Sequence, residues 1–157
     1  MSRILIYTFR TFPYMSQLRQ EFSDIFILDK LKQDINYLCK TLQKKESLTI
    51  IGVAKASKKY NYSQIETIAL NKFAQRKKID GNGPLHVALN VPNKIILECF
   101  RIRRTGTMAF CNYAMYKIQL CILTNKLKVK HIFLHIKPEH IKCIKKLLYM
   151  NQWQYDL

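Results

Sequence analysis

Three residues of this 157-residue chain have the types and positions that nucleophilic catalysis requires. Cys111 falls where an apolar segment meets a predicted helix, and a thiol at a helix N-terminus faces the positive end of the helix dipole, which favours the thiolate. His135 lies near the end of a predicted strand. Glu66 stands in an otherwise apolar segment, where a carboxylate needs a partner because burying a lone charge is costly. A Cys nucleophile, a His base and a Glu that orients the His would form a complete triad.

Each of these residues also has a simpler interpretation. A cysteine on an apolar helix usually packs in the core. A single histidine in a strand is usually a satisfied core or rim residue, and Glu66 could pair with one of the many lysines. Triad partners are adjacent in space and not in sequence, so the spacing of the residues leaves both interpretations open.

The elements that must position these residues alternate along the chain. Runs of β-branched and aromatic residues predict strands, and apolar residues spaced three and four apart predict helices. We expect strands at 4–9, 25–28, 48–53, 65–70, 107–110 and 129–136, and helices at 17–22, 33–45, 92–100, 112–125 and from Pro138 onward. Such alternation is typical of an α/β fold of packed layers with a mostly parallel sheet, in which ligands gather at the carboxyl ends of the strands. No repeat or linker interrupts it, so we expect one domain over residues 1–157.

The charge of the chain raises the question of a nucleic-acid partner. Lys and Arg total 27 against 10 Asp and Glu, a formal net charge of +17. Only seven of the basic residues are Arg, whose planar fork is the usual reader of phosphates and bases. We therefore do not favour nucleic acid as the partner. No apolar run approaches the ~18 residues of a membrane span and the N-terminus does not have the pattern of a signal peptide, so we expect a cytoplasmic chain with no membrane partner.

Five cysteines are present, an odd number without a C-x-x-C pair. This pattern indicates neither a zinc ribbon nor a disulfide framework. We expect Cys111 to be the candidate nucleophile and the other four to be core residues, and we expect neither a metal nor an organic cofactor. The other four are Cys39, Cys99, Cys121 and Cys143.

Four segments resemble the pyroglutamyl peptidase I (pyrrolidone carboxyl peptidase) family of cysteine peptidases, in the family's order. They are 65–71 (Ile-Glu-Thr-Ile-Ala-Leu-Asn), 80–84 (Asp-Gly-Asn-Gly-Pro), 110–116 (Phe-Cys-Asn-Tyr-Ala-Met-Tyr) and 133–138 (Phe-Leu-His-Ile-Lys-Pro). They are similar to the family's Glu segment, its Asp-Gly-Pro turn, its nucleophile motif and its His segment. The resemblance implies a three-layer α/β/α sandwich with a mostly parallel mixed sheet, phosphorylase/hydrolase-like. It also implies a Cys111–His135–Glu66 triad that acts through a thioester, with the backbone N–H groups of Cys111 and Asn112 binding the oxyanion.

The substrate pocket departs from the family's pattern. Phe9 and Phe12 match the two phenylalanines that flank the pyroglutamate ring in the family. Val53 stands where the family has a pocket Gln, and Ser57 replaces an Arg near its active site. The chain is also shorter than ordinary members. The resemblance thus implies a complete triad beside an altered specificity pocket, because losing a hydrogen bond to the substrate relaxes or redirects specificity.

Two functions follow from different features of the chain. The first is hydrolysis of peptides that begin with pyroglutamate or a related N-terminal group. The alternative is a catalytically degenerate member whose basic surface binds nucleic acid or an acidic partner. Lys142, Lys145 and Lys146 would form one basic helix face for it, although we favour a merely solvated face. Members of the family often self-associate, so a homo-oligomer is also left open.

Overall fold

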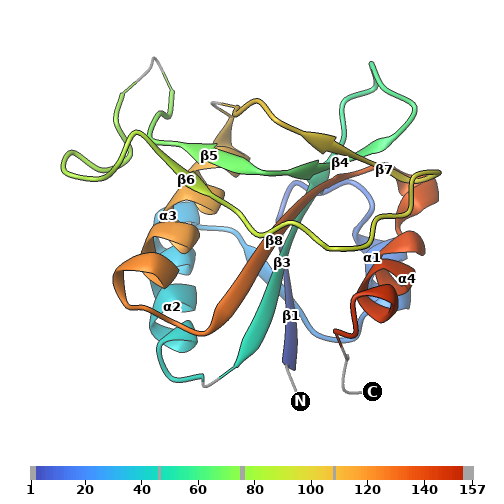
Figure 1. Ribbon diagram of the computed structural model, residues 1–157, viewed down its shortest axis with the longest axis horizontal. Coiled ribbons are helices and arrows are strands. Elements are labelled where there is room, and N and C mark those ends of the chain that lie inside the picture. The colour runs from blue at the N-terminus through green and yellow to red at the C-terminus, as the bar shows by residue number, and fades with distance from the viewer. Residues whose placement is uncertain (1–2, 46, 75–76, 108, 154–157) are drawn as a thin grey trace.

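A six-stranded mixed sheet forms the middle of the fold, in the order β2–β1–β3–β8–β4–β7 (Figure 1). The computed structural model of the chain describes residues 3–45, 47–74, 77–107 and 109–153. Strands β2, β1, β3 and β8 run parallel, β4 is antiparallel to β8, and β7 is parallel to β4. The six strands are β1 (Arg3–Phe9), β2 (Ile25–Leu28), β3 (Leu48–Lys55), β4 (Ser63–Glu66), β7 (Phe100–Arg103) and β8 (Val129–Ile136).

Helices cover both faces of this sheet. In Figure 1, α2 and α3 lie on one side and α1 and α4 on the other, and each pair packs on its own hydrophobic cluster. A separate antiparallel pair, β5 and β6, lies against α3. The bounds are α1 (Met15–Glu21), α2 (Leu31–Leu42), β5 (Ile68–Leu70), β6 (His86–Ala88), α3 (Phe110–Thr124), the short 3₁₀ helix η1 (Pro138–His140) and α4 (Cys143–Met150). The predicted α/β/α sandwich with a mostly parallel mixed sheet is confirmed.

The sequence patterns explain this layering. Leu48 through Ala54 of β3 are all buried, as expected for a parallel strand covered on both faces. The stripe Ile35, Leu38 and Leu42 is the buried side of α2. No helix in the described part of the chain is long and apolar enough to cross a membrane.

Two predicted elements are wrong. The described residues of the predicted strand 107–110 do not form a strand, and residue 108 lies outside the described residues: Ala109 has an extended backbone and caps α3, so Phe110 is already helical. The segment 92–100 is not a helix: it makes a single turn, in which the N–H groups of Cys99 and Phe100 both donate to the carbonyl of Ile96, before β7 begins. The helical spacing of its apolar residues extends over only one turn, which buries Ile96 and Cys99.

The predicted strand at 65–70 is divided into β4 and β5. The division falls at Thr67, whose hydroxyl donates to the carbonyl oxygen of Arg103 at 2.7 Å. β4 joins the central sheet and β5 leaves it, which carries the chain from Glu66 toward the start of α3.

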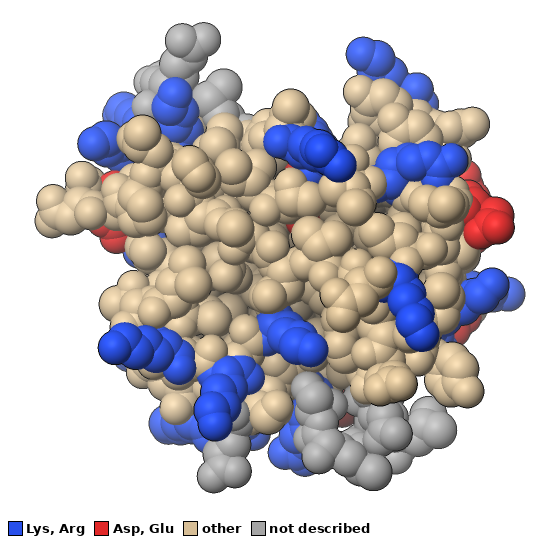
Figure 2. Space-filling model, in the orientation of Figure 1, with Lys and Arg blue, Asp and Glu red and all other residues tan. Residues whose placement is uncertain are grey.

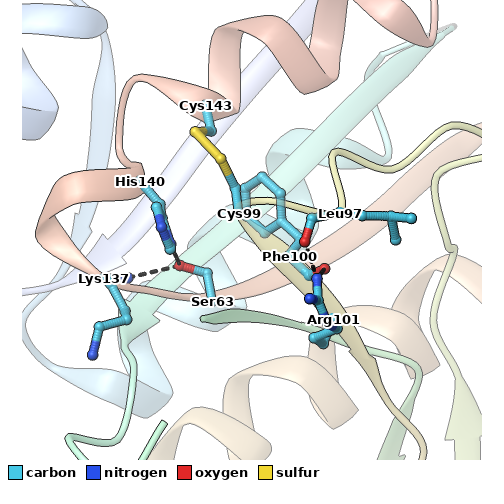
Figure 3. Close-up of a disulfide and its surroundings, with 8 residues drawn as sticks. All are labelled: Ser63, Leu97, Cys99, Phe100, Arg101, Lys137, His140 and Cys143. Atoms are coloured by element: carbon cyan, nitrogen blue, oxygen red, sulfur yellow. Dashed lines mark hydrogen bonds between the residues drawn. A yellow bond between two sulfur atoms is a disulfide. The ribbon is translucent and has the colours of Figure 1, made fainter. Parts of the chain in front are cut away.

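A disulfide, which the sequence did not indicate, joins Cys99 and Cys143, two of the four cysteines expected to be core residues (Figure 3). It joins the turn before β7 to the start of α4, two sites 44 residues apart in the sequence. Beside it, the Ser63 hydroxyl lies 3.0 Å from His140 Nδ1 and accepts the Lys137 N–H at 2.9 Å, so the end of β8 is also held to β4.

Candidate active site

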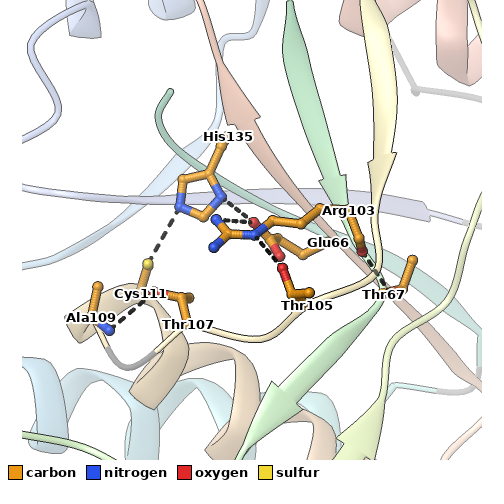
Figure 4. Close-up of polar contacts among 8 residues, drawn as sticks. All are labelled: Glu66, Thr67, Arg103, Thr105, Thr107, Ala109, Cys111 and His135. Atoms are coloured by element: carbon orange, nitrogen blue, oxygen red, sulfur yellow. Dashed lines mark hydrogen bonds and ion pairs between the residues drawn. The ribbon is translucent and has the colours of Figure 1, made fainter. Parts of the chain in front are cut away.

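Cys111 is the second residue of α3 and is almost completely buried. Its Sγ lies 3.4 Å from Nε2 of His135 (Figure 4). The extended backbone of Ala109 ends the preceding loop and starts the helix at this point, which places the thiol at the helix N-terminus. The Cys111 thiol therefore lies at a helix N-terminus and next to an imidazole.

Asn112 anchors the first turn of α3. Its buried side chain accepts the N–H of Leu70 at 2.9 Å and donates to the carbonyl oxygens of Leu70 and Lys72, both at 2.8 Å. These three bonds join the helix turn that carries Cys111 to the segment that follows Glu66. The residue after the cysteine thus positions the nucleophile relative to β5.

His135 and Glu66 come from neighbouring strands. Glu66 on β4 lies opposite Phe133 of β8, which is two residues from His135 and on the same face of the sheet. The distance between His135 Nδ1 and Glu66 Oε1 is 2.6 Å. The structure thus brings the three predicted residues into one hydrogen-bonded chain from Glu66 through His135 to Cys111 (Figure 4).

The electrostatics of His135 are set by its partners. Burial alone would lower its pKa, but the hydrogen bonds and negative charges of Cys111 and Glu66 outweigh burial and raise the pKa to about 9. The raised pKa favours the protonated form of His135 at neutral pH. A protonated imidazole between a thiol group and a carboxylate is the arrangement that an imidazolium–thiolate pair needs.

Arg103 is a neighbour that the sequence did not indicate. Its Nη1 lies 3.5 Å from Glu66 Oε1, and its Nε donates to the Thr105 hydroxyl at 3.4 Å. Glu66 itself is fully buried, and its Oε2 has no hydrogen-bond partner in the described part of the chain. The spacing of Arg101 and Arg103 places both on one face of β7, but it does not indicate that Glu66 is the partner of Arg103.

An aromatic pocket of ≈ 380 Å³ opens beside Cys111 and His135. Phe9 and Phe12, the two phenylalanines singled out in the sequence, both line it. Phe110 lines it as well, with its ring edge-on to Phe9 at 4.8 Å between centroids. The place of Phe110 next to the cysteine in the sequence is the only signal for this role.

The structure places two predicted site groups elsewhere. The side chain of Val53 is fully buried in the core and does not line the pocket, which is bordered by its neighbours Ala54 and Lys55 instead. Alternation along β3 turns Val53 to the other face of the sheet. The N–H of Asn112 donates to the carbonyl of Ala109 at 2.9 Å, so it is already used in the helix and is not directed at the pocket.

The structure shows no metal site: the described residues contain no group of three or more His, Cys, Asp or Glu side chains arranged to hold a metal ion. On the face in Figure 2, Lys and Arg side chains are spread over several elements instead of forming one patch. On α4, Lys145 pairs with Glu21 at 3.4 Å, so part of the predicted basic helix face is occupied within the protein.

Comparison with known proteins identifies relatives only by structure. No protein-family model matches the sequence, and no curated protein sequence matches it. Pyroglutamyl peptidase I from Bacillus amyloliquefaciens is similar at a TM-score of 0.75 and 15% identity, over 96% of each chain. A mutant pyrrolidone carboxyl peptidase from the hyperthermophile Pyrococcus furiosus is similar at 0.71 and 16% identity, over 96% of this chain and 98% of that one. The resemblance to this family is thus confirmed in three dimensions, and the chain has the pyroglutamyl peptidase fold.

Proposed function

We propose that this protein is a cysteine peptidase that removes an N-terminal pyroglutamyl group, or a closely related neutral group, from peptides. The observation that carries the proposal is the bonded chain Glu66–His135–Cys111 at the mouth of an aromatic pocket. The fold shared with pyroglutamyl peptidases supports it.

The aromatic pocket is suited to the N-terminal group. Phe9, Phe12 and Phe110 offer ring faces and edges that a flat, uncharged lactam can contact. None of the described residues that line the pocket is an Asp or Glu, so a charged N-terminal amine would lose its hydration there without a carboxylate to replace it. The scissile carbonyl of a group seated among these rings would lie next to Cys111.

Acylation begins from the imidazolium–thiolate pair. The Cys111 sulfur attacks the carbonyl carbon, a C–S bond forms, and the carbonyl electron pair moves to oxygen. The backbone N–H of Cys111, at the N-terminus of α3, is the donor that we assign to this oxyanion. The oxyanion then collapses, the C–N bond breaks, and the leaving amine takes the proton from Nε2 of His135.

Deacylation restores the starting pair. The now neutral His135 accepts a proton from water as the hydroxide attacks the thioester. The C–S bond breaks, the acid is released, and the thiolate again faces the imidazolium. Glu66 holds His135 by Nδ1 throughout and stabilises its positive charge. Protein side chains, backbone and water supply every group in this sequence of steps.

The test is hydrolysis of a pyroglutamyl-coumarin amide by the wild type, by Cys111→Ala and by the matched control Cys121→Ala. Wild type and Cys121→Ala should release coumarin, and Cys111→Ala should be slower by roughly four orders of magnitude. Equal release by all three proteins, or none by the wild type, contradicts the proposed activity.

A further inference from the structure

A second pocket borders His135. It is lined by basic side chains, whereas the pocket beside Cys111 is aromatic. Its volume is ≈ 480 Å³, and it shares only His135 and Lys55 with the aromatic pocket. Cys111 is not among its lining residues. The charged and amide side chains that line this basic pocket are those of Lys55, Lys58, Lys59, Gln64 and Arg103.

The positive charge of this basic pocket is only partly neutralised within the protein. Arg103 faces Glu66 at 3.5 Å. Lys55, Lys58 and Lys59 are exposed, and none of them forms an ion pair within the described ranges. Three ammonium groups around one hollow raise its potential and attract an anion.

The loop that presents these lysines is held in place. The Lys59 N–H donates to the Ser57 hydroxyl at 3.2 Å, and the Lys137 ammonium donates to the Tyr60 carbonyl at 2.6 Å. The Tyr60 and Tyr62 rings stack at 5.1 Å. A loop fixed in this way loses little conformational freedom when a ligand binds.

The proposed reaction determines which part of a peptide would enter the basic pocket. The N-terminal group occupies the aromatic pocket, and His135 must lie beside the leaving nitrogen in order to protonate it. The residues after the scissile amide therefore extend past His135. On that side lies the basic pocket, with the buried Gln64 directly opposite His135 in the sheet.

We propose that the basic pocket selects peptides with an Asp or Glu side chain just after the scissile amide, and that Lys58 and Lys59 determine this preference. The inference rests on the proposed function, because that function supplies the direction of the peptide. Exposed ion pairs are individually weak, so two or three lysines together should give roughly a tenfold preference at low salt.

Two isosteric peptides measure this preference: pyroglutamyl-glutamyl and pyroglutamyl-glutaminyl peptides of otherwise identical sequence. The wild type should cleave the glutamyl peptide with roughly tenfold higher kcat/KM, and added salt should reduce the difference. Lys58→Gln/Lys59→Gln should abolish the preference. The control Lys44→Gln/Lys128→Gln removes the same charge from exposed positions. Both precede the N-terminal ends of β3 and β8, away from the basic pocket, so this variant should retain the preference. Equal cleavage of the two peptides by the wild type overturns the inference.

Binding to the Cys111→Ala protein separates this inference from the proposed function. Calorimetry with the same two peptides should show tighter binding of the glutamyl peptide, with the difference lost in the added Lys58→Gln/Lys59→Gln background. If the wild type cleaves neither peptide but this binding difference is present, the peptidase proposal fails and the anionic preference stands. Equal binding of the two peptides, or no binding of either, overturns the preference.

Discussion

Strand β8 carries two histidines in opposite electrostatic environments. His131 and His135 are four residues apart and therefore point to the same face of the sheet. His131 is fully buried, its Nε2 lies 2.9 Å from the Tyr7 hydroxyl, and burial lowers its pKa to about 3. His135 lies near the carboxyl end of the strand, and its pKa is raised to about 9.

The partners explain the difference. Burial acts on both rings in the same direction, against the charged form. His131 meets a neutral hydroxyl, whereas His135 meets a carboxylate and a thiol group. Depth in the sheet therefore does not decide what a strand histidine does. The ionisable groups that neighbouring elements bring to it decide whether it is a structural or a chemical residue.

Replacement of His135 should have the largest effect of the changes at the two histidines. His135→Asn should lower kcat/KM on the pyroglutamyl-coumarin amide by about three to four orders of magnitude, because the imidazole that pairs with Cys111 is lost. Expressed as a free energy, this loss of activity should be much larger than the change in the free energy of unfolding. Full activity in His135→Asn would remove this residue from the mechanism.

Glu66→Gln isolates the charge that distinguishes the two sites. The amide keeps the shape of the side chain but cannot stabilise an imidazolium, so kcat/KM should fall by roughly two to four orders of magnitude. As the pH rises, any remaining activity should begin to decline at a lower pH than in the wild type. The reason is that Glu66 is one of the two groups that raise the pKa of His135. A pH–rate profile that is unchanged in this variant would show that Glu66 does not act on His135.

The converse change is expected at His131. His131→Ala leaves the Tyr7 hydroxyl buried without its partner and opens a cavity, which should cost about 2–4 kcal/mol of unfolding free energy. Activity of the folded variant should remain within a few-fold of the wild type. Urea unfolding together with the coumarin assay checks both parts, and a large loss of activity at unchanged stability would contradict the structural role of His131.

The smallest expected effect is on the pH dependence of the free energy of unfolding, which should differ in direction between the two histidines. The raised pKa of His135 contributes stability that is complete below pH 6.5 and is lost as the pH rises to about 9. The lowered pKa of His131 contributes stability that is complete above pH 6.5 and is lost as the pH falls toward 3. We therefore expect urea unfolding from pH 4 to 9.5 to show that the free energy of unfolding of His135→Asn approaches that of the wild type at alkaline pH. A constant difference between the two proteins across this range would contradict the raised pKa.

The sequence was sufficient to predict the layered fold and to name Glu66, Cys111 and His135, because short motifs and the alternation of elements are local patterns. It could not reveal Arg103 beside Glu66, since that contact joins β7 to β4. The partner of Cys99 could not be predicted either, because Cys143 is 44 residues away and no local pattern links the two.

Positions inferred from motif alignment are less secure than the motifs themselves. Val53 occupies the expected place in β3, but strand alternation turns its side chain into the core. The sequence pattern predicts Phe110 at the end of a strand, yet the cap at Ala109 makes it the first residue of α3 and places its ring in the aromatic pocket. In both cases one residue of register decides whether a side chain reaches the site.

Activation of Cys111 by His135 can be measured by alkylation. The proteins are treated briefly with iodoacetamide at neutral pH, and the labelled cysteines are mapped by mass spectrometry. Cys121 is an internal comparator, because its hydrogen bond with Cys39 lowers its pKa to about 7 without any contribution from His135. We expect rapid labelling of Cys111 in the wild type and at least tenfold slower labelling in His135→Asn, with Cys121 unchanged. Equal labelling of Cys111 in both proteins, or none in the wild type, would contradict this activation.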